Sequence, residues 1–186
     1  MSISMRIRAS SLAVTMLAGW VAFAGSPAAA GPVESDQVSR ILSDAKMQAL
    51  QLKEDADQLE TFTRSDASWE SHADAIGKIR EDVNAMGRLL TRLEDNRQLA
   101  VPWQQTAIDR VNPVAKELAS NTTAAIEHLN KNPHRLNTAA YQEYLEAISD
   151  SANNLAATIA DFVEYGKTRQ RLERLATKLE VPAATQ

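Results

Sequence analysis

The sequence predicts an all-α protein, an antiparallel up-down-up-down four-helix bundle that follows a cleaved signal peptide. Two observations support this fold class. Apolar residues recur at alternating spacings of three and four in four successive runs, as in helices that turn one apolar stripe toward their neighbours. The breaks between these runs are short, and short connections make neighbouring helices antiparallel. Apolar alternation of period two, which indicates strands, is missing from the sequence.

The N-terminal residues have the pattern of a secretory signal peptide. Arg6 and Arg8 precede an apolar run over residues 12–24, in the order that such signals show. This run is shorter than the about 20 apolar residues of a membrane-spanning helix. An uncleaved N-terminal anchor is the alternative interpretation.

Small residues follow the apolar run, and Ala28 and Ala30 match the pattern of a cleavage site. We therefore expect cleavage before Gly31, which divides the chain into a signal peptide over residues 1–30 and a bundle domain over residues 31–186. The protein is expected to be exported, either periplasmic or secreted, without stable membrane insertion after cleavage.

Composition and charge exclude several kinds of covalent site and one class of partner. The chain has no cysteine, which excludes disulfides, a lipid-modified N-terminal cysteine and haem attachment through C-x-x-C-H. The formal net charge is −4 for the whole chain, and it becomes −6 without Arg6 and Arg8, because residues 1–30 hold no other charge. We therefore expect no binding to nucleic acid, which is usually recognised by a basic face.

The first two apolar runs predict helices over residues 38–59 and 69–93. Ser35 and Asp36 precede the first run, and both residue types cap helix starts. The stripe of the first run consists of Val38, Leu42, Ala45, Ala49, Leu52, Ala56 and Leu59. That of the second consists of Trp69, Ile76, Ile79, Val83, Met86, Leu90 and Leu93, with His72 as its one polar member.

The third and fourth runs predict helices that begin at Pro102 and after the caps Asn137 and Thr138. We expect Pro113 to bend the third helix or to split off its first turn, since proline lacks an amide N–H and clashes with the preceding turn. The third stripe consists of Ile108, Val111, Ala115, Leu118, Thr122, Ala125 and Leu129. The fourth consists of Tyr141, Leu145, Ile148, Ala152, Leu155, Ile159 and Phe162.

After Phe162 the apolar spacing is displaced at Gly166, and we expect the fourth helix to bend or break there. Residues 167–180, named here the C-terminal segment, carry five basic and two acidic residues, a formal charge of +3. This segment is either a docking surface for an acidic partner or an anionic lipid surface, or a solvated basic helix end, where positive charge is favourable.

All three histidines of the chain, His72, His128 and His134, are expected at one end of an antiparallel bundle. They are weak candidate ligands for copper or zinc. Bundle metal sites place Glu-x-x-His pairs on facing helices, and this sequence has no such pair. We therefore expect no metal, with His72 in the stripe and the other two facing solvent near loops.

The sequence also lacks the marks of a cofactor site or an enzyme. The architecture is similar to that of soluble b-type cytochromes of the bacterial periplasm, whose haem is held by a methionine on the first helix and a histidine on the last. Met47 lies in the first run, but the fourth has no histidine. Neither a G-x-S-x-G turn nor a glycine-rich phosphate loop is present, so we expect no cofactor, no catalytic residue and no enzymatic activity.

The stretches VPWQQTAIDRVNPVAKEL and ASNTTAAIEHLNKNPHRLN, residues 101–118 and 119–137, resemble parts of uncharacterised exported bacterial helical-bundle proteins. The resemblance implies export and a bundle, and no activity. The expected function is binding through helix faces to an unknown protein partner or to a second copy. The candidate apolar anchors are Met47, Leu50, Leu172, Leu175 and Leu179, and the alternative is that these residues belong to a wider core. The alternative is an extracytoplasmic bundle that binds copper or zinc at the histidine end.

Overall fold

The computed structural model describes residues 35–62, 67–133, 136 and 138–180. All of them belong to one compact unit of the chain, Pro32–Gln186. The predicted signal peptide with its cleavage residues Ala28, Ala30 and Gly31 lies outside the described residues, as do His134 and Asn137.

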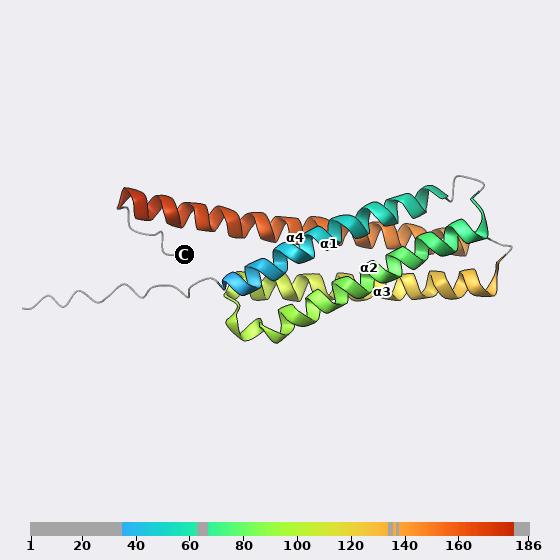
Figure 1. Ribbon diagram of the computed structural model, residues 1–186, viewed down its shortest axis with the longest axis horizontal. Helices are drawn as coiled ribbons and strands as arrows, with labels where there is room; N and C mark the ends of the chain where they lie inside the picture. The colour runs from blue at the N-terminus through green and yellow to red at the C-terminus, as the bar shows by residue number, and fades with distance from the viewer. Residues whose placement is uncertain (1–34, 63–66, 134–135, 137, 181–186) are drawn as a thin grey trace, which may run out of the picture. The chain divides into compact units, whose positions relative to one another are not determined.

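The described chain forms four long helices, which confirms the predicted fold class (Figure 1). They are α1 (Asp36–Thr61), α2 (Trp69–Asp95), α3 (Pro102–Lys131) and α4 (Ala139–Leu179), with a short 3-10 helix η2 (Arg97–Leu99) between α2 and α3. The helices pack in a ring, because α1 contacts α2 and α4, and α3 contacts the same two helices. The described ranges contain no strand.

Contacts at the two ends of the bundle show the antiparallel order. The indole Nε1 of Trp69, at the start of α2, donates to the carbonyl of Leu129 near the end of α3, at 3.3 Å. At the opposite end, the Gln104 amide donates to Ser39 Oγ at 2.9 Å, which joins the first turns of α3 and α1. Neighbouring helices therefore run in opposite directions, and diagonal helices run in the same direction.

The predicted caps agree with the helix starts. Ser35 accepts a hydrogen bond from the Val38 amide at 3.3 Å and begins α1. Ser68, for which sequence analysis made no prediction, accepts from the Ser71 amide and begins α2. Pro102 occupies the first turn of α3, where its missing N–H leaves no helical hydrogen bond unmade.

The core follows the predicted stripes and is wider than they are. Every predicted stripe residue of α1 is buried. Four of the predicted residues on the other helices are only partly buried: Trp69, Val83, Ala115 and Phe162. Six apolar residues outside the predicted stripes are also buried in the core: Ile41, Ala100, Val101, Ala107, Ala156 and Val163. A globular bundle buries an apolar face wider than the two positions per heptad of a coiled coil.

Two expected interruptions do not occur. α3 continues through Pro113, which is exposed, and does not lose its first turn. α4 continues through Gly166 to Leu179, a length of 41 residues, so the expected break there is wrong. A glycine inside a helix costs about 1 kcal/mol relative to alanine, and burial of side chains such as Val163 in the preceding turn outweighs that cost.

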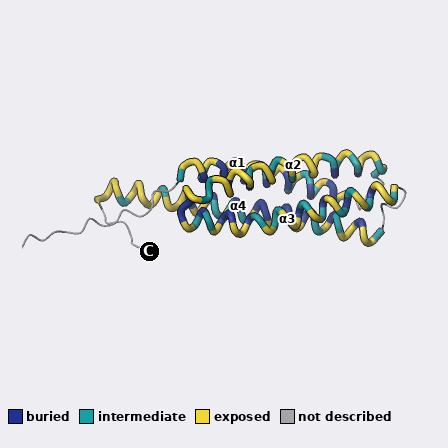
Figure 2. Tube along the Cα trace, turned by 90° about the horizontal axis from the view of Figure 1, so that it is seen from below, coloured by how far each residue is buried: buried dark blue, intermediate teal, exposed yellow. Residues whose placement is uncertain are grey.

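The described helices include none with the length and apolar character that a membrane crossing requires. α4 is longer than α1, α2 and α3, which have 26, 27 and 30 residues. Its C-terminal part extends past the first turns of α1 and α3 (Figure 1). In Figure 2 the same part is coloured mostly as exposed. The C-terminal part of α4 is therefore an extension of one helix beyond the first turns of α1 and α3 (Figure 1).

Candidate functional site

The predicted histidine end is a packed cluster of aromatic rings from three helices. Tyr141 of α4 is fully buried and lies between His72 of α2 and His128 of α3. The Tyr141 hydroxyl is 3.2 Å from Nδ1 of His72, and its ring stacks on that of His128 with centroids 5.5 Å apart. Phe62, at the end of α1, meets the edge of the His72 ring. The structure thus brings two of the three histidines together, as the sequence predicts.

Burial keeps the central pair of this cluster neutral. It lowers the pKa of His72 and raises the pKa of Tyr141 to about 12, because a charged ring is poorly solvated among apolar side chains. A neutral imidazole and a neutral phenol share the hydrogen bond between them. His72 is therefore a core residue with one ring nitrogen already bonded.

The expectation that His128 faces solvent is wrong. It is half-buried, stacks on Tyr141, and its Nε2 lies 3.1 Å from the Thr138 hydroxyl at the start of α4. Across the described ranges, no three histidine or acidic side chains are grouped as a metal site requires. His134, the third weak candidate, lies outside those ranges.

Two aspartates make polar contacts between helices. Asp57 of α1 accepts hydrogen bonds from Ser149 and Asn153 of α4 at 3.0 and 2.9 Å. Partial burial alone raises the pKa of Asp57, but these bonds together with Lys53 lower it overall. The pKa of Asp82 of α2 is raised instead, mainly by burial and then by the nearby carboxylate of Asp55. Asp82 also accepts a hydrogen bond from the Gln48 amide of α1 at 2.8 Å, so both carboxylates link neighbouring helices.

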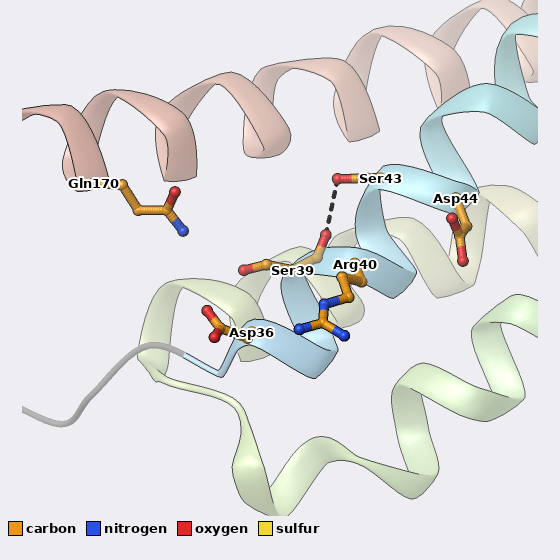
Figure 3. Close-up of a pocket in the computed structure, with 6 residues that line it drawn as sticks. All are labelled: Asp36, Ser39, Arg40, Ser43, Asp44 and Gln170. Atoms are coloured by element: carbon orange, nitrogen blue, oxygen red, sulfur yellow. Dashed lines mark hydrogen bonds between the residues drawn. The ribbon is translucent and has the colours of Figure 1, made fainter.

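A shallow open groove of about 420 Å³ lies where α4 leaves the bundle (Figure 3). Its lining is polar and comes from the start of α1 and from Gln170: Asp36, Ser39, Arg40, Ser43, Asp44 and Gln170. Its charged residues, Asp36, Arg40 and Asp44, are all exposed. Exposed groups in an open groove give little selectivity for a small ligand, which is usually held in a concave, largely apolar site.

Two residues at the start of α3 that sequence analysis did not single out contact α1 and α4 close to the C-terminal segment. Gln104 is fully buried, accepts from the Val101 amide at 3.1 Å and donates to Ser39. The neighbouring Trp103 packs edge to face on Tyr165 of α4, with centroids 5.5 Å apart. A glutamine at the third helical position can reach back to the helix start, which is the one signal that could have identified Gln104.

Beyond Gln170 the C-terminal segment is exposed. Leu172, Leu175 and Leu179 have 60, 44 and 65% of their surface accessible, and only Ala176 among residues 171–180 is half-buried. Spacings of three and four place these leucines on one side of the helix, and we call them the leucine stripe. Their exposure excludes the alternative that they belong to a wider core, and their role as anchors stays a prediction.

A second stripe runs beside the first. It consists of Lys167, Arg171, Arg174 and Lys178, and is named the basic stripe. Three of its members directly precede a leucine of the leucine stripe, so the two stripes lie about 100° apart around the helix. The side chains of both stripes are exposed, and all of them except Lys167 lie beyond Gln170 on the extension of α4.

The other two candidate anchors lie on the bundle itself. Met47 and Leu50 of α1 have 67 and 42% of their surface accessible, so they are exposed as well. Their two-residue patch lies within the length of α1 that packs on α2 and α4. It lacks the row of basic residues that accompanies the leucine stripe, and it provides a matched control for that stripe.

Comparison of the chain with family models, with curated proteins and with solved structures finds no match in any of the three. The candidate site therefore rests on the burial, charge and spacing of the C-terminal segment.

Proposed function

We propose that this chain is an exported, non-enzymatic binding protein, which uses the C-terminal segment of α4 as its contact surface. The observation that carries the proposal is the exposure of Leu172, Leu175 and Leu179 on one side of a helix. Exposed apolar stripes rimmed by charged residues are characteristic of interaction sites. The export part of the proposal rests on the pattern of residues 1–30.

The remainder of the bundle acts as a rigid support for this segment. The buried side chains of four helices hold α4 in place up to Gly166. Trp103 then packs on Tyr165 of α4 near the point at which α4 leaves its neighbours, and Gln104 ties the first turns of α3 and α1 together. A contact surface on a helix held in this way is ordered before it meets a partner, which lowers the entropy cost of binding.

Photo-crosslinking in cells tests the proposed surface. A photoreactive residue replaces Leu175, and in a matched control it replaces Leu50, which is similarly exposed at 42% against 44%. We expect adducts from position 175, with protein or with lipid, and few from position 50. Equal yields at both positions, or none at either, would contradict the proposal.

Intact mass measurement on protein recovered from the extracytoplasmic fraction of a bacterial host tests export and cleavage. We expect a chain that begins at Gly31. A retained N-terminus would indicate an anchored protein, and recovery from the cytoplasm alone would contradict export.

A further inference from the structure

The leucine stripe does not continue the core-facing side of α4. Val163 is buried in the bundle, and Leu172 follows it by about two and a half helical turns, which places it on the opposite side of the helix. Leu179 lies on nearly the same side as Leu172. The neighbouring helices of the same bundle therefore leave these leucines uncovered, and whatever covers them comes from outside the bundle.

Charge is unevenly divided between the C-terminal segment and the body of the protein. The segment has a formal charge of +3, whereas residues 31–166 have −9, which is the −6 of residues 31–186 less this +3. From Gln170 to Leu179 the helix extends by roughly 14 Å at 1.5 Å per residue. That exceeds the screening length of about 8 Å at physiological salt, so the end of the segment presents its positive charge largely independently of the acidic body.

From these observations we infer that the C-terminal segment docks the protein peripherally on an anionic lipid surface. The leucine stripe enters the boundary between headgroups and acyl chains, and the basic stripe meets the lipid phosphates. The inference rests on the binding role proposed above and names its partner.

The acidic residues of the segment fit this orientation. Glu173 and Glu180 directly follow Leu172 and Leu179. They therefore lie on the side of the helix opposite to the side that the leucine and basic stripes share, about half a turn away from it. With both stripes against the surface, these two carboxylates face water. The acidic body is also held away from the lipid, because it lies at the other end of the extension.

A second copy fits the segment less well. Pairing two segments brings two charges of +3 together, and three leucines per chain offer far less area than the roughly 1,200 Å² of a stable protein interface. A lipid surface needs no matching shape, and its charge is opposite to that of the segment. The same area argument disfavours an acidic protein that contacts this segment alone.

Vesicle binding tests the inference on the purified chain. The probes are vesicles of phosphatidylcholine alone and vesicles of equal parts phosphatidylcholine and phosphatidylglycerol, with co-sedimentation as the readout. We expect binding to the anionic vesicles at least about tenfold tighter than to the neutral ones, and weaker binding at higher salt. Wild-type and variant chains share one N-terminus, so any contribution from residues before Ser35 is equal in all of them.

Two pairs of matched variants test the two stripes separately. Each control removes the same kind of side chain from an exposed position elsewhere on the bundle. R171Q/R174Q should weaken binding to anionic vesicles by about 25-fold, roughly fivefold for each charge removed. The control R80Q/R88Q removes the same charge from exposed positions of α2 and should leave binding unchanged.

The second pair tests the apolar contact. L172S/L179S should weaken binding about tenfold or more, because two leucines no longer enter the lipid. Its control, M47S/L50S, replaces two exposed apolar residues of α1 and should have no effect. All four variants alter exposed side chains, so unchanged thermal unfolding confirms that the fold is retained.

Each outcome decides a separate question. Failure of the wild-type chain to prefer anionic vesicles, or equal losses in a variant and its control, overturns the lipid inference. If vesicles fail while position 175 crosslinks to a protein or a second copy, the proposed function stands with a different partner. If neither lipid nor protein contacts position 175, the proposed function fails as well.

Discussion

The two ends of the bundle differ in how far their large side chains are buried. At one end, Tyr141, His72 and His128 come from three helices and bury one another. At the other end, Leu172 and Leu179 belong to a single helix that extends beyond its neighbours, and they are exposed. Side chains are covered where helices end together and uncovered where one helix continues alone. The first arrangement contributes stability, and the second leaves surface available for binding.

The largest expected effect is at the packed end. Tyr141→Ala should lower the free energy of unfolding by about 3–5 kcal/mol, because it removes a buried ring and leaves His72 without its hydrogen-bond partner. The matched change Leu172→Ala at the exposed end should cost no more than about 0.5 kcal/mol. Urea unfolding measures both, and equal losses would mean that the two ends do not differ as described.

A smaller effect on stability is expected at the start of α3. Gln104→Ala removes a buried amide that bonds Val101 and Ser39, and should cost about 1–3 kcal/mol. Gln98→Ala, at an exposed position of η2, should change stability by less than about 0.5 kcal/mol. A neutral result for Gln104 would show that the tie between α1 and α3 is unimportant for stability.

The packed end should also make stability depend on pH. Burial lowers the folded-state pKa of His72 below the ordinary value of 6.5, so the unfolded chain takes up this proton at higher pH than the folded chain. The free energy of unfolding is then highest above pH 6.5 and falls as pH decreases toward the folded-state pKa, by at most about 1.4 kcal/mol per pH unit. Thermal unfolding measured above and below pH 6.5 follows this decline.

His72→Phe should remove the decline near pH 6.5, and a variant with unchanged pH dependence would exclude His72 as its source. A second decline, from Asp57, should persist in this variant. The folded-state pKa of Asp57 lies below 3.8, so its contribution is present above pH 3.8 and is lost as pH falls through the folded-state value.

The smallest effect on stability is expected from removing the exposed end. A chain that stops at Gln170 should unfold within about 0.5 kcal/mol of wild type, since no residue after Gln170 is buried among those described. The same chain should lose binding to anionic vesicles. A chain that stops at Thr158, without the buried residues Ile159 and Val163, should be several kcal/mol less stable, about 3–5. Comparable losses in both truncated chains would place the exposed end in the folded core.

Sequence reasoning predicted the bundle well because one physical rule governs most of it. Spacings of three and four put residues such as Leu42 and Leu145 on one side of a helix, and that side becomes the core. The short connections, which make neighbouring helices antiparallel, placed His72 and His128 at one end. At Gly166 the displaced spacing suggested a bend or a break. The break does not occur, because the displacement marks the end of packing and not the end of the helix.

The candidate site was only partly predictable. The leucines and basic residues of the C-terminal segment are evident from spacing and charge. Their exposure depends on where α1 and α3 begin relative to α4, which no local pattern reports. The same applies to Gln104, whose contacts with Ser35 and Ser39 join residues far apart in the chain.

By itself, the sequence determined the helical fold class, the helix starts at Ser35 and Pro102, and the stripes that form the core, because capping and amphipathic periodicity are local properties of the chain. Tertiary structure alone decided that His128 packs on Tyr141 and that Leu172 and Leu179 remain uncovered. The physical reason is that burial depends on which helices lie alongside a residue, and α4 extends beyond its neighbours at one end of the bundle only.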